Sequence, residues 1–320
     1  MRIGFIGVGG IAGNYLRSLK RLDRTVAAVC DINAERAAKV ATEQGGTAYG
    51  DHREMLDREK LDVVFIAIPP GAHESQVADA AQAGAAVFVA KPIGLDLDTV
   101  RRTRDVIAHK GVINQVGYMA RYSDITEKAR ELCRDQQLGM GVGRFLCRMG
   151  ASHPWWGKKA ISGGQMLEQS THVFDLLRYF LGEVAEVQAF GHQGIADDIA
   201  DFEDSTVCNL RFANHTVGNV TSACCANALE GFVVEFLGRD FYLKLVMDTK
   251  LQGKINGQDI EFQGEETGYF RQVEQFVQAV ERNDQSLVRS SYEDAARTLA
   301  VTLAANRSLE TGHLEQVPEI

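Results

Sequence analysis

The chain has 320 residues, 45% of them hydrophobic and 24% charged, with a formal net charge of −9. These values favour two globular domains and exclude a disordered chain. The acidic charge disfavours nucleic-acid binding, and no apolar run reaches the roughly 18–20 residues of a membrane helix, so we expect neither nucleic acid nor membrane as a partner.

The six cysteines predict free thiols. None is spaced as Cys-x-x-Cys, and Cys224 and Cys225 are adjacent, which suits neither a bridge nor a metal site. The residues before the first strand do not resemble a secretory leader, and we expect none. We therefore expect a reducing, cytoplasmic location.

Residues 1–120 alternate between strand-like and helical patterns. The strand-like runs are residues 2–6, 26–30, 62–68, 85–90 and 111–116, and the helical patterns are residues 11–20, 34–43, 74–83 and 98–110. This alternation predicts βαβ units and a parallel sheet that is covered on both faces. We expect an α/β dinucleotide-binding Rossmann domain over residues 1–120.

Residues 121–320 have a different pattern, in which helices flank a series of strands. We expect helices at 124–135, 165–181, 270–280 and 292–309, and strands at 184–192, 206–212, 216–224, 231–237, 242–247 and 259–262. Hairpin turns are expected at residues 214–215, 238–240 and 256–257. This pattern predicts a second domain, of α+β class, built on an open and mostly antiparallel sheet.

The first motif is a glycine turn directly after the first strand. It is a G-x-G-x-x-A pattern that opens a helix and reads Gly7-Val8-Gly9-Gly10-Ile11-Ala12. Gly7 permits the tight turn, Gly9 lets a pyrophosphate approach the backbone, and Ala12 permits close helix packing. We expect this turn, with Gly10 and Ile11, to present backbone N–H groups to the phosphates of a dinucleotide.

An acidic residue stands where this pattern expects one. Asp31 lies 22 residues after Gly9, at the end of the second strand, and its carboxylate suits the ribose hydroxyls of NAD. It would repel the extra phosphate of NADP, but Arg36 softens that preference and NADP stays open. The alternative is a glycine-rich turn with a surface aspartate that caps the helix beginning at Ala34.

Further coenzyme contacts are expected where the next strand ends. The candidates after the run at 62–68 are Ile68, Pro69, Pro70 and His73. Strand ends of this kind line the crevice in which dinucleotides bind. His73 is equally well explained as a residue at the start of a helix with no role in binding.

Lys91 follows the strand at 85–90 and precedes Pro92, which fixes the turn. This position lies beside the expected nicotinamide. The ammonium group can hydrogen-bond a substrate hydroxyl and stabilise a developing alkoxide. The alternative is a solvated loop lysine.

Three polar residues fall on one face of the helix predicted at 165–181. Glu168 and His172 are four residues apart, and His172 and Asp175 are three apart. An acid beside a histidine fixes its tautomer and raises its basicity, which suits general acid–base catalysis. The alternatives are a helical ion pair or a metal site, but no further ligand cluster accompanies these residues and we expect no metal.

Taken in order, these motifs resemble the Gfo/Idh/MocA oxidoreductase family over nearly the whole chain. The resemblance implies a Rossmann domain followed by an α/β domain whose open sheet commonly serves as an oligomer interface, so a homodimer or homotetramer is expected. It assigns Lys91 to the lysine of the family's Glu-Lys-Pro motif and His172 to its active-site histidine. Glu168 stands where many members have aspartate, and Asp175 matches the acid after the histidine.

The chain departs from the family pattern at Ala90, which replaces the glutamate before the lysine. Ser170 also stands where glycine is frequent. The loss of a charge at residue 90 removes a group that positions the lysine or the nicotinamide. The strength of catalysis and the substrate class are the properties that this change puts in question.

The resemblance implies NAD-dependent oxidation of a secondary alcohol on a sugar, cyclitol or related polyol. In this hypothesis His172 accepts the hydroxyl proton, Lys91 hydrogen-bonds the same oxygen and Glu168 orients His172. One alternative is an NAD-using glycoside hydrolase or lyase of the same family. Another is a non-catalytic dinucleotide sensor, which Ala90 favours.

The expected substrate-facing segment covers residues 148–159 and contains His153, Trp155 and Trp156. Aromatic faces stack on sugar rings, although a core role for one tryptophan is the alternative. Further candidates for substrate binding are Arg121, Tyr122 and Asp175.

Overall fold

The computed structural model describes residues 1–149 and 155–320, which form two compact units. The first unit comprises Met1–Met119 and Tyr269–Ala296, and the second comprises Ala120–Gly268 and Arg297–Ile320. Neither unit is continuous in sequence, and the division of function at residue 120 stays a prediction. No helix within the described ranges is long and apolar enough to cross a membrane.

The first unit contains a six-stranded sheet in the order β3-β2-β1-β4-β5-β6. Its strands are β1 (Ile3–Ile6), β2 (Val26–Cys30), β3 (Thr47–Tyr49), β4 (Val63–Ile66), β5 (Ala86–Val89) and β6 (Asn114–Val116). Every neighbouring pair runs parallel. The predicted Rossmann fold is confirmed, and the strand order reverses at β1, where such sheets bind ligands.

Helices join these strands and complete the first core. They are α1 (Ala12–Arg21), α2 (Ala34–Gln44), α3 (His52–Glu59), η1 (Pro70–Ala72), α4 (Gln76–Gln82), α5 (Leu97–Lys110), α10 (Gly268–Arg282) and η3 (Gln285–Leu287). The rings of Phe5 and Phe88 each stack on Phe65 with centroids 4.9 Å apart. Phe276 of α10 meets Phe65 edge-on at 5.8 Å. A helix from late in the chain therefore completes the core of the first sheet.

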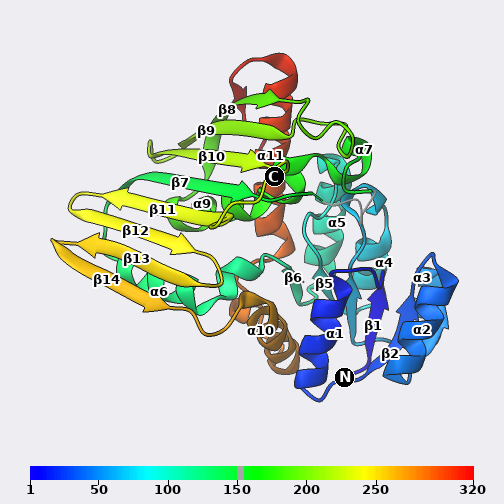
Figure 1. Ribbon diagram of the computed structural model, residues 1–320. Helices are drawn as coiled ribbons and strands as arrows, with labels where there is room; N and C mark the ends of the chain where they lie inside the picture. The colour runs from blue at the N-terminus through cyan, green and yellow to red at the C-terminus, as the bar shows by residue number, and fades with distance from the viewer. Residues whose placement is uncertain (150–154) are drawn as a thin grey trace. The chain divides into compact units, whose positions relative to one another are not determined.

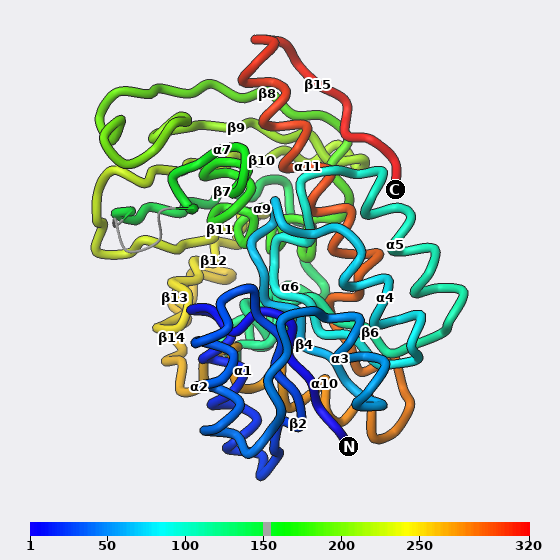
Figure 2. Tube along the Cα trace, turned by 90° about the vertical axis from the view of Figure 1, so that its right-hand side faces the viewer, coloured from blue at the N-terminus to red at the C-terminus, as the bar shows by residue number. Residues whose placement is uncertain are grey.

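The second unit contains a nine-stranded sheet in the order β14-β13-β12-β11-β7-β10-β9-β8-β15, seen as the fan of arrows in Figure 1. The strands are β7 (Leu138–Leu146), β8 (Val184–His192), β9 (Ser205–Phe212), β10 (Val217–Ala223), β11 (Phe232–Gly238), β12 (Phe241–Val246), β13 (Lys250–Ile255), β14 (Gln258–Gln263) and β15 (Glu315–Gln316). Strand β7 runs parallel to β10, and the other described neighbours are antiparallel. The predicted open, mostly antiparallel sheet is confirmed. Figure 2 shows the carboxy-terminal segment with β15 beside β8.

All three predicted hairpin turns are confirmed. They connect β9 to β10, β11 to β12 and β13 to β14. Each contains a residue with positive φ, namely His215 at 69°, Asp240 at 52° and Asn256 at 51°. Asn, Asp and His occur in this left-handed conformation more often than most residues, which is why these turns are recognisable in the sequence.

The central strand β7 was not predicted, because its sequence is rich in glycine. The structure gives these glycines a packing role against α9 (Thr171–Leu181). A Cβ at Gly141 would lie 2.7 Å from the Leu177 side chain, and one at Gly143 would lie 2.2 Å from that of Val173. Glycine therefore lets α9 approach the sheet, and this requirement outweighs the low strand propensity of the residue.

The helix predicted at 165–181 is wrong as a single element. The structure has two helices, α8 (Gln165–Glu168) and α9, separated at Gln169 and Ser170. The amide of Ser170 bonds to the carbonyl of Gln165 at 3.0 Å, one residue further back than in a regular α-helix. Glu168 and His172 therefore do not lie on one face of a common helix. The other helices of this unit are η2 (Met119–Tyr122), α6 (Asp124–Cys133), α7 (Lys159–Ser162) and α11 (Tyr292–Thr311), whose first residues belong to the first unit.

Candidate functional site

The glycine turn after β1 has the backbone geometry that a phosphate cradle needs. Gly7 has a φ of 81°, and a Cβ there would lie 2.5 Å from the carbonyl oxygen of Ala67. At Gly9 a Cβ would meet no atom within 4 Å, so the space beside this backbone is open. Ala12 is fully buried at the start of α1. The turn is thus held tightly at Gly7 and open at Gly9, which fits a pyrophosphate.

Asp31 is a buried carboxylate at the end of β2, directly beside this turn. Its Oδ2 accepts a hydrogen bond of 2.9 Å from the amide of Val8, and its Oδ1 accepts one of 2.8 Å from the amide of Asn33. Arg36 donates to both oxygens, from Nε at 3.0 Å and from Nη2 at 2.7 Å. Burial alone raises the pKa of Asp31, but the hydrogen bonds from Arg36, Val8 and Asn33 outweigh it and hold the pKa below its usual value.

The alternative reading of Asp31 as a surface cap is wrong. Asp31 is 5% exposed, and the cap of α2 is Asn33, whose side chain accepts a hydrogen bond from the amide of Arg36. The carboxylate is therefore buried beside the phosphate turn, where the Rossmann pattern places its ribose-binding acid.

The loop after β4 contacts the loop after β1. The amide of Ala67 donates to the carbonyl of Ile6 at 2.8 Å, and the side chain of Ile68 lies 2.8 Å from a Cβ built at Gly7. Pro69 and Pro70 then lead into η1. These contacts bring Ile68, Pro69 and Pro70 to the carboxyl edge of the sheet that also carries the glycine turn.

His73 ends this loop as a partly buried imidazole. Its Nε2 atom is buried and has no hydrogen-bond partner among the residues that the structure describes. Burial lowers the pKa of His73 to about 4. Its Cβ lies 3.8 Å from the position of a Cβ at Gly94, in the loop that follows β5. The ring is thus neutral at physiological pH and lies between the loops that follow β4 and β5.

Lys91 lies at the same edge, directly after Ala90 and two residues beyond the end of β5. The amide of Ala90 donates to the carbonyl of Ile66 at 2.8 Å, which fixes this loop against the end of β4. The peptide between Lys91 and Pro92 is cis. The structure therefore places the predicted coenzyme residues of the first unit after the carboxyl ends of β1, β2, β4 and β5, either in the loops or, for Ala12 and Pro70, at the first residue of the following helix.

In the second unit, Glu168 is buried at the end of α8. Its Oε2 accepts hydrogen bonds from the indole Nε1 of Trp156 and from the side-chain amide of Gln169. Trp156 also packs on an apolar cluster that includes Phe202 and Cys224. Both the core role and the polar contact of this tryptophan are therefore present, while Trp155 is partly exposed and His153 lies outside the described residues.

His172 lies in the first turn of α9 and faces the sheet. Its ring is 6.5 Å from that of Phe145 on β7 and 6.0 Å from that of Phe232 on β11. These two phenylalanines are paired across the strands. His172 as a residue is 6% exposed, so strand pairing and helix packing together fix its position.

Arg121 and Asp175 form a buried ion pair. Arg121 donates to the two carboxylate oxygens of Asp175 at 2.7 and 2.6 Å, and the two side chains are 3% and 1% exposed. Thr298 of α11 donates to the same carboxylate at 2.9 Å, and the guanidinium lies 4.7 Å from the ring centroid of Tyr179. Tyr122, the neighbour of Arg121, is also buried. Bidentate pairing of this kind fixes α9 relative to η2 and α11.

Two contacts of the second unit have no local sequence signal. Arg121 and Asp175 are 54 residues apart, and Thr298 is 123 residues from Asp175. Arg121 and Asp175 are separate candidates in the sequence, and no sequence pattern marks Thr298. No group of three or more potential metal ligands occurs in the two described stretches of the chain.

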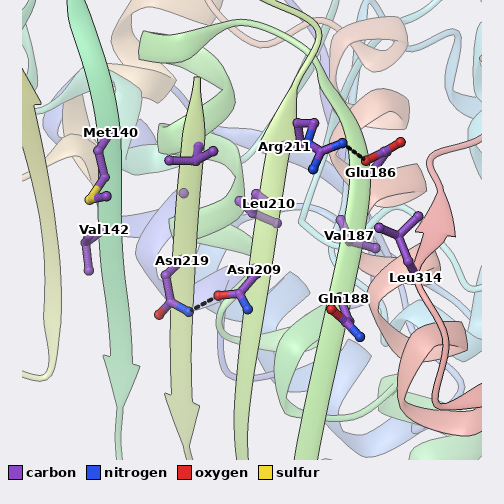
Figure 3. A pocket seen from close by; sticks show the side chains of 12 residues that line it. Met140, Val142, Glu186, Val187, Gln188, Asn209, Leu210, Arg211, Asn219 and Leu314 are labelled. Atoms are coloured by element: carbon purple, nitrogen blue, oxygen red, sulfur yellow. Dashed lines mark hydrogen bonds and ion pairs between the residues drawn. The ribbon is translucent and has the colours of Figure 1, made fainter. Parts of the chain in front are cut away.

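A separate hollow of about 360 Å³ lies on the open face of the second sheet. Figure 3 shows its polar floor, where Asn219 donates to Asn209 at 2.8 Å and Arg211 pairs with Glu186 at 2.9 Å. Met140 and Val217, which line it, are each 41% exposed. Its lining, within the described residues, contains none of the predicted catalytic side chains.

Two family models match the chain, one in its amino-terminal part and one in its carboxy-terminal part. The family model described as an oxidoreductase family with an NAD-binding Rossmann fold matches residues 1–118. The model described as the GFO/IDH/MocA C-terminal domain matches residues 126–243.

Individual relatives extend this match over the full length. A myo-inositol 2-dehydrogenase of Thermotoga maritima is 27% identical over 100% of this chain and 99% of its own. The scyllo-inositol 2-dehydrogenase (NAD(+)) of Bacillus subtilis is 26% identical over 98% of this chain and 95% of its own. A structure of levoglucosan dehydrogenase in complex with NADH and levoglucosan has a TM-score of 0.89 at 21% identity, over 100% of both chains. At that identity the last comparison shows the fold.

Proposed function

Because the chain belongs to the Gfo/Idh/MocA family of oxidoreductases and its first domain is an NAD-binding Rossmann fold, we propose that it is an NAD-dependent dehydrogenase. Its proposed substrate is a secondary alcohol of a cyclitol, sugar or related polyol. The observation that carries this proposal is the match to a myo-inositol 2-dehydrogenase over 100% of this chain.

The coenzyme residues are proposed at the carboxyl edge of the first sheet. They are Gly7, Gly9, Gly10, Ile11, Ala12, Asp31, Ile68, Pro69, Pro70, His73 and Lys91. The open backbone at Gly9 and the buried carboxylate of Asp31 support this assignment. When it is bound, the nicotinamide supplies the redox chemistry by exchanging a hydride with a substrate carbon.

The proposed catalytic residues are Lys91, His172 and Glu168. Lys91 donates a hydrogen bond to the substrate oxygen and stabilises the negative charge that develops there. His172 accepts the hydroxyl proton as general base. Glu168, which is fixed by Trp156 and Gln169, keeps the segment before α9 in place and so positions the imidazole.

On the substrate side we propose direct contact for Trp155 and Trp156, whose aromatic faces suit sugar rings. Arg121, Tyr122 and Asp175 are assigned to this side in a positioning role. Their burial supports that role, because the Arg121–Asp175 pair is almost closed to solvent.

The proposal is tested by incubating the purified protein with NAD and a panel of inositols and sugars, and by measuring NADH formation by its absorbance. Replacement of Lys91 by alanine should lower kcat by about a hundredfold or more, whereas the Kd for NAD, measured by calorimetry, should rise by about tenfold or less, because Lys91 is one of many proposed coenzyme contacts. Lys110→Ala, at the exposed end of α5, is the matched control and should leave both values unchanged.

The same assay separates the alternative functions. Ala90 favours a sensor without catalysis, which would bind NAD and turn over no substrate in the panel. Cleavage of a glycoside without net NADH would instead identify an NAD-using hydrolase or lyase. Equal turnover by the wild type and Lys91→Ala would remove Lys91 from the mechanism.

We also propose that the open face of the second sheet joins copies of this chain into a homodimer or homotetramer. Support comes from the exposed apolar side chains on this face, such as Phe190 at 56% and Val207 at 43%, because large exposed patches commonly mark interfaces. Light scattering of the wild type and of Val207→Glu tests this. The cytoplasmic location stays a prediction from cysteine usage.

A further inference from the structure

The carboxylate of Asp31 is already saturated by donors from its own chain. A carboxylate offers about four lone-pair positions. Here the amides of Val8 and Asn33 take one hydrogen bond each, and Arg36 donates two. A ribose that binds to Asp31 through its hydroxyls must therefore displace a donor, and the side chain of Arg36 can move while the two backbone amides cannot.

Arg36 is held at this point by the local fold. It lies in the first turn of α2, and its amide donates to the capping side chain of Asn33 at 2.9 Å. Its side chain is 45% exposed, whereas that of Asp31 is 3% exposed. The guanidinium thus covers the solvent side of the carboxylate and cancels its charge.

This arrangement leaves part of the guanidinium available to a ligand. A guanidinium has five N–H donors, and the pair with Asp31 uses one from Nε and one from Nη2. Arginine is well suited to phosphate because its donors match that geometry. An isolated Asp31 would repel a 2′-phosphate, but an Asp31 neutralised by Arg36 does not.

We propose that Arg36 determines coenzyme choice and gives this chain the capacity to bind NADP as well as NAD. With NADP, Arg36 stays on Asp31 and donates its remaining N–H groups to the 2′-phosphate. With NAD, the ribose hydroxyls compete with Arg36 for the carboxylate. This inference rests on the proposed coenzyme site at the carboxyl ends of β1 and β2.

Equilibrium binding to the full-length protein without substrate tests this inference. Calorimetric titrations with NAD and NADP are compared for the wild type and Arg36→Ala. The wild type should bind the two coenzymes with Kd values within about tenfold of each other. In Arg36→Ala the Kd for NADP should rise about tenfold or more, because a charge-assisted contact is lost, while the Kd for NAD should fall or stay the same.

Two further variants control for charge and for folding. Lys39→Ala removes a positive charge from the exposed side of the same helix and should change neither Kd by more than about twofold. Arg36→Lys keeps the charge and should retain NADP binding better than Arg36→Ala does. Unchanged melting temperatures show that each variant is folded.

The outcomes separate this inference from the proposed function. If the wild type binds NAD but not NADP, or if Arg36→Ala weakens both coenzymes equally, Arg36 only holds Asp31 in place and the inference is overturned. If the wild type binds neither coenzyme, the proposed function fails as well. Fragments that carry only the ribose end sharpen the result, because 2′,5′-ADP should lose affinity in Arg36→Ala and 5′-ADP should not.

Discussion

The two sheets of this protein position their functional groups in different ways. In the first sheet, β1, β4 and β5 are buried at every residue, so their side chains only fill the core and the candidate residues lie in the segments that follow the strands. In the second sheet, strands such as β9 alternate between buried and exposed residues. One face packs on α9, which carries His172, and the other face is open. A sheet that is buried on both faces can therefore present functional groups only at its edge. A sheet that is buried on one face leaves the other face free for binding.

Two buried carboxylates make the same comparison at the level of single residues. Asp31 takes its partners from Asn33 and Arg36, close in sequence, and from the glycine turn. Asp175 takes its partners from Arg121 and Thr298, which are 54 and 123 residues away. The first acid belongs to a local motif, and the second depends on the tertiary structure of its unit.

The largest effect is expected from a substitution that breaks the long-range ion pair between Arg121 and Asp175. Arg121→Ala should lower the free energy of unfolding by about 3–5 kcal/mol, because it leaves the buried charge of Asp175 without its partner. Urea denaturation followed by circular dichroism measures this. Arg211→Ala, which removes an ion pair on the open face of the same sheet, should cost about 1 kcal/mol or less. Similar losses in the two variants would show that the buried pair is not essential to the second unit.

A smaller effect on stability is expected at the glycine turn, where substitutions of Gly7 and Gly9 should differ. Gly7→Ala should cost about 2 kcal/mol or more, because it forces an L-residue to a φ of 81° and places a Cβ 2.5 Å from a carbonyl oxygen. Gly9→Ala meets no neighbour in the protein and should change stability by about 0.5 kcal/mol or less.

Gly9→Ala should nevertheless weaken coenzyme binding about tenfold, because its Cβ enters the space proposed for the pyrophosphate. Thermal unfolding and calorimetric titration with NAD measure the two effects separately. If Gly9→Ala kept the wild-type Kd, the phosphates would have to bind elsewhere.

The last effect concerns pH and a single group of the first unit. The pKa of His73 is lowered from 6.5 to about 4 by burial. Because the unfolded chain binds the proton more readily, the stability that His73 contributes is complete above about pH 6.5 and is lost as the pH falls toward about 4. His73→Gln removes this titration. Between those pH values its free energy of unfolding should fall less than that of the wild type, and parallel curves would contradict the assignment.

The sequence by itself determined the features that depend on short-range geometry. The Gly7-to-Ala12 turn followed by Asp31 identified the Rossmann fold, because a tight turn and a strand end need particular residues at fixed spacing. The hairpin turns at His215, Asp240 and Asn256 were found for the same reason, since their left-handed backbone limits the choice of residue. The predicted site residues of the first unit lie at one edge of the sheet, directly after its strands, for this local reason.

Only the tertiary structure decided the features in which distant residues compete for the same group or space. Strand β7 forms despite its glycines because α9 needs Gly141 and Gly143 to reach the sheet. The helix break before His172 and the partners of Glu168 and Asp175 depend on packing that no local spacing records. The ion pair between Arg36 and Asp31 has both origins. The two residues are close in sequence, but saturation of the carboxylate also requires the amide of Val8, from the loop after another strand. Burial of a side chain and saturation of its hydrogen bonds depend on all the residues packed around it. They are therefore fixed only when the whole unit is folded.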